Sequence, residues 1–114
     1  MHSRTSRLAL PALALTAAAL LQPVLASAPA DAATRPWDRL ASCESGGRWH
    51  VATGNGYYGG LQFSAGTWRA YGGQRYAAFA HRASRTEQIR IAERVQNAQG
   101  WGAWPSCSRQ VGLR

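Results

Sequence analysis

The spacing of apolar side chains predicts three helices in the second part of the chain. In the first, Trp37, Leu40 and Ala41 recur at intervals of three and four residues, which places them on one face of a helix. We expect this helix to span residues 36–44, with Thr34 as its N-cap. A pair of glycines follows and is typical of a helix end.

Two further helix starts carry N-capping residues. Ser64 precedes a helix that we expect to end near Tyr71, and Ser84 with Glu87 matches a capping box that opens a helix ending at Gln99. A glutamine at the inner edge of an apolar face needs hydrogen-bond partners, from the protein or from a ligand. The predicted buried stripe of this last helix is Gln88, Ile91, Ala92, Val95, Ala98 and Gln99.

Residues 49–63 follow a different pattern, with aromatic and β-branched side chains around the Gly-Asn-Gly sequence at residues 54–56. This predicts a short hairpin or an irregular loop rather than a regular sheet. Such a loop is either simply exposed or lets the backbone approach a ligand closely. Trp49, Tyr57 and Tyr58 favour the second interpretation, because aromatic rings stack on the apolar faces of sugars. The fold class is therefore α+β: a small, mainly helical domain.

The N-terminal residues predict export. Arg4 and Arg7 precede an apolar run at residues 8–21, and small-residue cleavage options follow it. This is the layout of a secretory signal peptide, which we assign to residues 1–32, leaving one domain at residues 33–114. The apolar run is too short and too interrupted by proline for a comfortable membrane span. We expect the mature protein to be secreted, extracellular or associated with the cell wall, with no membrane contact.

A domain of about eighty residues has a marginal core and benefits from a covalent link. Its two cysteines, Cys43 and Cys107, lie near the two ends of the predicted domain and allow one intramolecular disulfide in an oxidising compartment. That bond would stabilise the fold by about 4 kcal/mol. A catalytic thiol at Cys43 is an alternative. The cysteines and three scattered histidines lack metal-ligand spacing, so we expect no metal and no cofactor.

The net positive charge of the predicted domain indicates which class of partner it binds. From residue 33 onward, eleven arginines face four acidic residues, which favours binding to an anionic surface or polymer. Bacterial wall polymers fit this description. Nucleic acid fits less well because the arginines are scattered rather than clustered.

Glu44 is the acidic residue whose position is most informative. It follows Trp37, Leu40 and Ala41 by seven, four and three residues, so it lies on their helix face. Burial and the C-terminal end of a helix both disfavour a carboxylate and raise its pKa, as a general acid requires. The alternative is a solvated last residue of the helix.

A second catalytic carboxylate is hard to find in the predicted domain. Asp38 lies about 120° from Glu44 around the helix, Glu87 belongs to its capping box, and Glu93 lies beside arginines off the apolar stripe. Glycosidases normally use a pair of carboxyl groups. The remaining possibility is one carboxyl group that acts first as an acid and then as a base towards the C6 hydroxyl of muramic acid, giving an anhydro sugar.

Four stretches carry a family resemblance. Residues 37–47 (Trp-Asp-Arg-Leu-Ala-Ser-Cys-Glu-Ser-Gly-Gly), 53–63, 67–68 and 99–107 resemble the catalytic domain of the resuscitation-promoting factors of actinobacteria. The resemblance implies a compact lysozyme-like fold related to soluble lytic transglycosylases and a disulfide between the two cysteines. It also implies cleavage of the MurNAc–GlcNAc bond of peptidoglycan, with Glu44 as the catalytic acid.

We therefore expect a muramidase or lytic transglycosylase that acts as a monomer on peptidoglycan glycan strands, with a cell-wall endopeptidase as a candidate partner and no nucleic acid. One rival is a basic wall-glycan binding module without activity. Another is a cationic protein that disrupts membranes or binds nucleic acid. The resemblance places Thr67 and Gln99 in the sugar cleft and the block around Tyr57 and Tyr58 beside it. The expected substrate-binding residues are Trp49, Tyr57, Tyr58, Gln62, Thr67 and Gln99.

Overall fold

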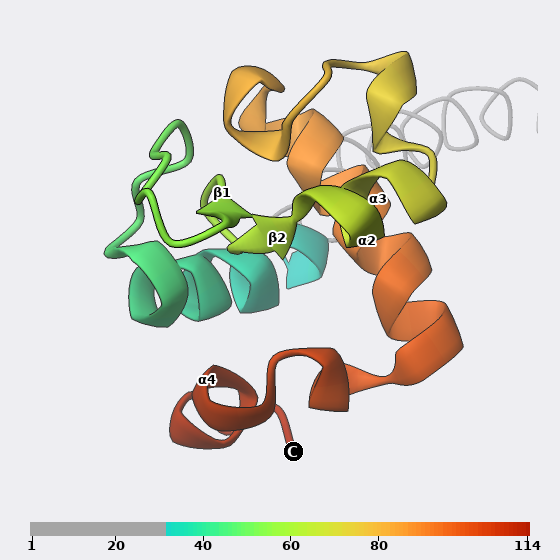
Figure 1. Cartoon of the computed structure of the whole chain (residues 1–114). Helices are drawn as coiled ribbons and strands as arrows, with labels where there is room; N and C mark the ends of the chain where they lie inside the picture. Colours follow the sequence, from blue (N-terminus) through green and yellow to red (C-terminus); the bar gives the residue numbers. More distant parts are fainter. Residues whose placement is uncertain (1–31) are drawn as a thin grey trace, which may run out of the picture. The chain divides into compact units, whose positions relative to one another are not determined.

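Helices and one small hairpin make up residues 32–114, the part of the chain that the computed structural model describes (Figure 1). The predicted signal peptide, residues 1–32, lies outside the described residues except for its last position. Contacts divide the chain into two units, Met1–Ala33 and Thr34–Arg114. The elements are a helix at residues 32–45, β1 (Tyr57–Tyr58), β2 (Phe63–Ser64), α2 (Ala65–Ala70), α3 (Arg85–Gln99) and α4 (Pro105–Gln110), with 3₁₀ turns η1 (Gly73–Arg75), η2 (Ala80–Arg82) and η3 (Trp101–Ala103).

The helix at residues 32–45 buries the predicted face. Trp37, Leu40 and Ala41 are all buried, and they contribute to the core of the domain. The prediction that Thr34 caps this helix is wrong, because residues 32 and 33 are already helical. Both are alanine, the strongest helix former, so nothing in the sequence ends the helix at Thr34.

The hairpin forms at a different turn from the one that the Gly-Asn-Gly sequence indicates. Tyr58 pairs with Phe63 in an antiparallel ladder, so the turn between β1 and β2 spans residues 59–62. The Gly-Asn-Gly segment forms a separate loop, closed by an antiparallel bridge between Ala52 and Tyr58. Within it, the Asn55 side-chain oxygen accepts a hydrogen bond of 3.1 Å from the Tyr57 amide. The sequence therefore predicts the hairpin correctly but places its turn too early.

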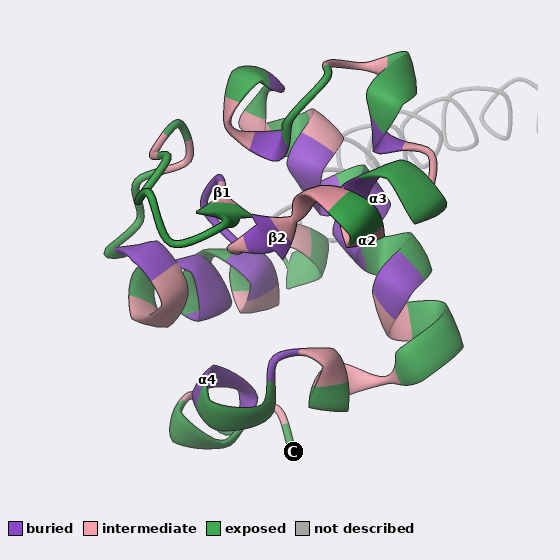
Figure 2. Ribbon diagram, in the orientation of Figure 1, coloured by how far each residue is buried: buried purple, intermediate pink, exposed green. Residues whose placement is uncertain are grey.

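Both predicted serine caps are present. The Ser64 hydroxyl accepts a hydrogen bond from the Thr67 amide at the start of α2. Ser84 and Glu87 form the complete capping box of α3. The predicted buried stripe of α3 is correct at Gln88, Ile91, Ala92 and Val95, whereas Ala98 and Gln99 are exposed because the last turn of α3 extends beyond the core (Figure 2).

Gln88 ties α3 to the glycine-rich loop from inside the core. Its side chain is fully buried, and its oxygen accepts a 3.0 Å hydrogen bond from the Gly60 amide. Its nitrogen donates to the carbonyl oxygens of Trp49 at 2.8 Å and Ala83 at 3.0 Å. Gly60 permits this approach, because a Cβ there would lie 2.5 Å from the Trp49 ring. A buried amide with three satisfied hydrogen bonds fixes the hairpin against α3.

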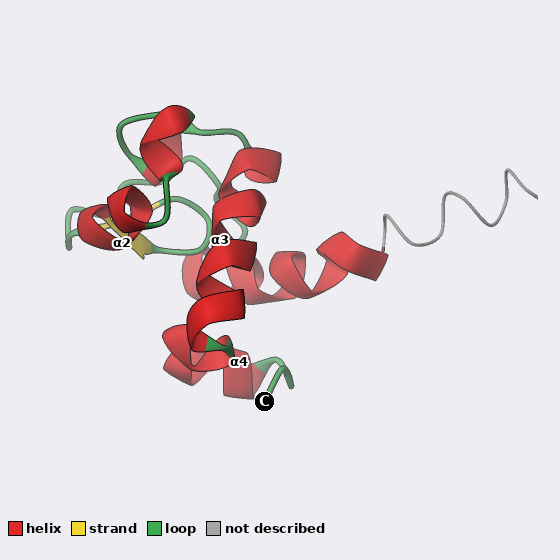
Figure 3. Ribbon diagram, turned by 90° about the vertical axis from the view of Figure 1, so that its right-hand side faces the viewer, coloured by secondary structure: helices red, strands yellow, loops and turns green. Residues whose placement is uncertain are grey.

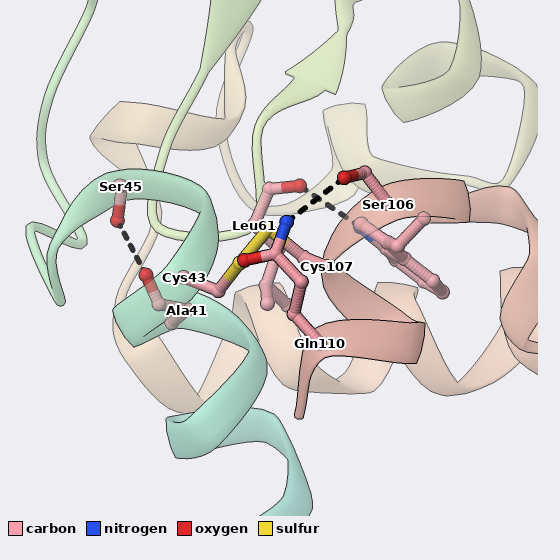
Figure 4. The surroundings of a disulfide bond; sticks show 8 residues. Ala41, Cys43, Ser45, Leu61, Ser106, Cys107 and Gln110 are labelled. Atoms are coloured by element: carbon pink, nitrogen blue, oxygen red, sulfur yellow. Dashed lines mark hydrogen bonds between the residues drawn. A yellow bond between two sulfur atoms is a disulfide. The ribbon is translucent and has the colours of Figure 1, made fainter. Parts of the chain in front are cut away.

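The C-terminal segment packs back against the first helix. Cys43 and Cys107 form a disulfide across 64 residues of sequence, so it joins the helix at residues 32–45 to α4 (Figure 4). Helix α4, which the sequence pattern does not indicate, has six residues with Pro105 at its first position. Proline has the right φ for that position and needs no amide partner there.

Aromatic rings fill the space between these elements. Trp37 contacts Trp101 and Trp104, with ring centroids 4.8 and 5.5 Å apart, and Phe63 packs edge-on against Trp68 at 5.2 Å. The α+β class, the mainly helical character and the single hairpin are therefore confirmed for residues 32–114 (Figure 3). None of the helices in this range is both long and apolar enough to cross a membrane.

Candidate functional site

Two adjoining cavities lie between the hairpin and the C-terminal segment. One has a volume of about 380 Å³ and is lined by Glu44, and the other has a volume of about 240 Å³ and is lined by Thr67 and Gln99. They share the side chains of Tyr57, Gln62, Ala103 and Trp104, so they form one continuous cleft, which we call the Glu44–Gln99 cleft.

Glu44 reaches this cleft because of where its helix ends. It lies in the last turn of the helix at residues 32–45, next to the disulfide-bonded Cys43. Gly46 and Gly47 follow with φ angles of 69° and 77°, and their amides bond the carbonyl oxygens of Ser42 and Ala41. Glycine adopts this left-handed backbone at little cost. The chain therefore turns away directly after Glu44 and leaves its side chain facing the cleft.

Burial raises the pKa of the Glu44 carboxyl group above its usual value of 4.5. The side chain is half-buried, and desolvation disfavours its charged form. The one ion pair among residues 32–114 joins Asp38 to Arg85 and does not involve Glu44. Glu44 therefore has no salt-bridge partner within the described residues that would favour its carboxylate form.

The other acids of the described residues are committed elsewhere. Asp38 accepts two hydrogen bonds from the Arg85 guanidinium group, at 2.9 and 2.6 Å, and this pair links the first helix to α3. Glu87 completes its capping box, and Glu93 is exposed on α3. Neither cavity of the cleft is lined by any of the three. Within residues 32–114, Glu44 is the sole acidic side chain that lines the cleft.

The far end of the cleft holds two of the predicted polar residues. The Thr67 hydroxyl accepts a 3.0 Å hydrogen bond from the Ser64 hydroxyl, which fixes the Thr67 side chain at the start of α2. Gln99, at the end of α3, donates a 2.9 Å hydrogen bond from its amide nitrogen to the Tyr71 hydroxyl. Tyr71 is therefore the hydrogen-bond partner that we expected Gln99 to need. The side-chain oxygen of Gln99 remains available to accept a hydrogen bond at the cleft.

The middle of the cleft is formed by the hairpin. Tyr57 is 47% exposed and lines both cavities from β1. Gln62 lines both cavities from the turn between β1 and β2. Within residues 32–114 it is the one residue other than glycine that has a positive φ angle, 55°. Its side-chain amide donates a 3.1 Å hydrogen bond to the Gly59 carbonyl oxygen. A non-glycine residue held in this conformation is uncommon and often lies at a functional site.

Trp49 and Tyr58, also predicted as substrate-binding residues, lie away from the cleft. The Trp49 ring packs against Gly60 and under the Arg85 guanidinium group, 5.6 Å from the ring centroid. Tyr58 points to the opposite side of the hairpin from Tyr57, because neighbouring strand residues alternate in direction. There the Tyr58 ring stacks on His81 at 5.3 Å.

The structure adds cleft residues that the sequence analysis did not single out. Trp104 is buried, lines both cavities and donates a 2.9 Å hydrogen bond from its indole nitrogen to the Leu61 carbonyl oxygen. Asn55 lines the cavity at Glu44, although its sequence indicated only a turn. The available signal for Trp104 was its place in residues 99–107, one of the four stretches that carry the family resemblance.

Among the described residues, no group of three or more histidine, cysteine or acidic side chains is placed to hold a metal ion. Both cysteines are in the disulfide, which excludes the catalytic thiol that the sequence left open. The groups that line the cleft include a half-buried carboxyl group, amides, hydroxyls and aromatic rings.

Comparison with known proteins identifies the domain. Residues 31–107 match the family model of the transglycosylase-like domain. The chain is 55% identical over 111 residues to resuscitation-promoting factor Rpf1 of Corynebacterium glutamicum, covering 97% of this chain and 56% of the relative. It is 58% identical over 88 residues to resuscitation-promoting factor Rpf of Micrococcus luteus, covering 76% of this chain and 38% of the relative.

A third relative, resuscitation-promoting factor RpfE of Mycobacterium tuberculosis, is 62% identical over 74 residues, covering 65% of this chain and 41% of the relative. The chain thus spans between about two fifths and just over half of the length of these three relatives. Residues 31–107, which the family model matches, include both cysteines, the hairpin and the residues that line the Glu44–Gln99 cleft. The chain therefore belongs to the resuscitation-promoting factors and contains their transglycosylase-like domain.

Proposed function

We propose that this protein is a secreted enzyme that cleaves the bond between MurNAc and GlcNAc in peptidoglycan, with Glu44 as its single catalytic acid and base. Membership of a transglycosylase-like family supports glycan cleavage as the reaction class. The observation that carries the proposal is the position of Glu44, half-buried and without another acidic side chain along the cleft in the described residues.

The raised pKa of Glu44 gives its first step a physical basis. In its protonated form, Glu44 donates its proton to the oxygen that bridges the two sugars. The bond between that oxygen and C1 of MurNAc breaks, its electron pair stays on the oxygen, and GlcNAc leaves with a free hydroxyl. Positive charge develops at C1 and the ring oxygen, and the new Glu44 carboxylate stabilises this charge.

The second step returns the proton to Glu44. Its carboxylate takes the proton of the C6 hydroxyl of the same MurNAc, and O6 bonds to C1, which gives a 1,6-anhydro product and restores the acid. The same carboxylate would activate a water molecule in a hydrolytic reaction and give a reducing end. Both routes need one carboxyl group near C1, as the lining of the cleft supports.

The remaining cleft residues suit the binding of a sugar chain. Tyr57 and Trp104 offer ring surfaces, while Gln62, Thr67 and Gln99 offer amide and hydroxyl groups along the two cavities. Sugars present the matching combination of apolar ring faces and hydroxyls. We propose that these five side chains hold successive sugars of the glycan strand on one side of Glu44.

The rival function is a non-catalytic wall-glycan binding module, which the same cleft and a basic surface would also serve. Mass spectrometry of purified peptidoglycan after incubation with the protein separates the two. The proposal expects new soluble muropeptides, with anhydro-MurNAc ends if transglycosylation operates and reducing MurNAc ends if water is the acceptor. If the protein binds peptidoglycan but creates no new glycan ends of either kind, the binding module is correct.

A further inference from the structure

A third cavity continues the cleft beyond Glu44. It has a volume of about 490 Å³ and is lined by Pro105, Ser106, Arg109, Gln110 and Arg114. Pro105 and Ser106 also line the cavity at Glu44, so the two cavities meet along the first turn of α4. We call this third cavity the α4 pocket. A ligand group attached to a sugar beside Glu44 would therefore reach the α4 pocket without leaving the protein surface.

The ionisable side chains that line the α4 pocket are cationic. Two of its five lining residues are arginines, and residues 105–114 contain no acidic side chain. The Arg109 guanidinium group is exposed and has no ion pair or side-chain hydrogen bond within the described residues. An arginine of this kind offers a fork of N–H donors that matches a carboxylate.

Arg114 is held in place at the other side of the pocket. Its guanidinium group donates 2.9 Å hydrogen bonds to the Ser108 hydroxyl and to the Pro105 carbonyl oxygen. These bonds fix the side chain over α4, and neither acceptor carries a formal charge. One arginine is therefore pre-positioned and the other is free to adjust, which suits an anionic group on a flexible chain.

The neutral side of the pocket is ordered by the disulfide region. The Gln110 amide nitrogen donates a 2.9 Å hydrogen bond to the Ser106 hydroxyl, and its oxygen lies 3.6 Å from the sulfur of Cys43 (Figure 4). The disulfide thus fixes the distance between the α4 pocket and Glu44, which follows Cys43 directly in the chain.

We propose that the α4 pocket binds a carboxylate of the stem peptide that peptidoglycan carries on MurNAc, so that this protein prefers peptide-bearing glycan to bare glycan. The inference rests on the proposed function, because it places MurNAc beside Glu44. The stem peptide leaves from the same sugar ring, and its acidic residues and C-terminus present carboxylates. A stem of four residues extends over ~13 Å when stretched, which is enough to cross the neighbouring cavity.

Binding of two soluble probes tests this proposal. Both probes are GlcNAc–MurNAc disaccharides, one with a tetrapeptide stem and one whose lactyl carboxyl group is capped as a simple amide. Neither contains a MurNAc–GlcNAc bond, so neither is cleaved, and Kd is measured by calorimetry with the full chain. We expect tighter binding of the peptide-bearing probe. Adding Arg109→Gln should lower the ratio of the two affinities by about threefold to tenfold, as for a single charge-assisted contact.

Two matched variants complete the test. Arg90→Gln removes an equal charge from an exposed position on α3 that lines none of the three cavities, and it should leave the affinity ratio unchanged. Arg109→Lys should recover part of the preference, because lysine keeps the charge but loses the fork geometry. The proposal is wrong if the parent shows no preference, or if Arg109→Gln and Arg90→Gln change the ratio equally.

Cleavage of intact peptidoglycan by the parent protein is scored separately. Loss of the affinity ratio in Arg109→Gln together with an inactive parent would support the α4 pocket and overturn the catalytic proposal. If the parent cleaves peptidoglycan but Arg109→Gln leaves its affinity ratio unchanged, the catalytic proposal is supported and the α4 pocket proposal is wrong.

Discussion

At the scale of single residues, the proposed chemistry rests on the environment of Glu44. Three apolar residues on the same helix face as Glu44 are buried. The Glu44 side chain is only half-buried, because its helix ends beside the cleft. Sequence spacing predicted this position and the direction of the pKa shift. The family resemblance, rather than spacing, implied that Thr67 and Gln99 line the cleft with Tyr57 beside it, and the cavities include all three together with the expected Gln62. Trp49 and Tyr58, which were expected there as well, lie away from the cleft.

The raised pKa of Glu44 has a consequence for stability that does not depend on any substrate. The folded state keeps the Glu44 proton at pH values where the unfolded chain has lost it, so this group lowers stability as pH rises from the unfolded pKa to the folded pKa. Glu44→Gln removes this titration. We expect the variant to have a higher Tm than the parent at pH 7, with a difference that shrinks towards pH 4.

Thermal unfolding of both proteins between pH 4 and pH 7 measures this difference. All other titrating groups are common to the two proteins, so their contributions cancel in the difference between the two Tm values. A Tm difference that stays constant with pH, or one that grows towards pH 4, would mean that burial does not raise the pKa of Glu44.

At the scale of elements, caps and turns decide how well the sequence predicts the fold. The capping residues Ser64 and Ser84 locate two helix starts within one residue, because capping is a local interaction. The hairpin turn was misplaced because its register depends on contacts with α3 through Gln88, which are distant in sequence. Helix α4 was not predicted, because six residues are too few to show a helical repeat of apolar positions. It is held in place by the disulfide at Cys107, which is a contact distant in sequence.

Gly60 is the position at which the hairpin turn meets the core most closely. A Cβ at Gly60 would lie 2.5 Å from the Trp49 ring, so Gly60→Ala must displace the turn or the ring. We expect a loss of about 1–3 kcal/mol in the free energy of unfolding, the usual cost of overpacking. Urea denaturation measures it.

Gly66 provides the matched control. It is exposed on α2, and a Cβ there meets nothing within 4 Å. Gly66→Ala should raise the free energy of unfolding by about 0.5–1 kcal/mol through helix propensity. Equal effects of the two substitutions would contradict the close packing between the hairpin turn and Trp49.

At the scale of the whole domain, the disulfide connects the helix at residues 32–45, which carries Glu44, to α4. Cys43 and Cys107 lie near the two ends of Thr34–Arg114, so their bond constrains almost the entire unfolded domain. It also fixes α4, and with it the α4 pocket, beside Glu44. The sequence predicted the pair because two cysteines allow one intramolecular bond, but it did not show that the bond lies at the cleft.

Replacing both cysteines with serine should lower the free energy of unfolding by about 4 kcal/mol, the chain-entropy value for a loop of this length. Denaturant midpoints of the parent and the double variant measure the loss. Treatment of the parent with a reductant should reproduce it, whereas the double variant should not respond. An unchanged midpoint in the reduced parent would show that the disulfide contributes nothing to stability.

The central claim is that one carboxyl group, Glu44, cleaves the glycan, and the most direct measurement compares cleavage with binding in the same variant. Glu44→Gln keeps the size of the side chain and removes its proton transfer, and Glu93→Gln makes the same change at an exposed position on α3 outside the cleft. Release of soluble muropeptides and co-sedimentation with insoluble peptidoglycan are measured for both. We expect Glu44→Gln to lose at least 100-fold in release, the scale of general acid catalysis, with binding retained and Glu93→Gln unaffected. Release by Glu44→Gln at the rate of the parent would contradict the account.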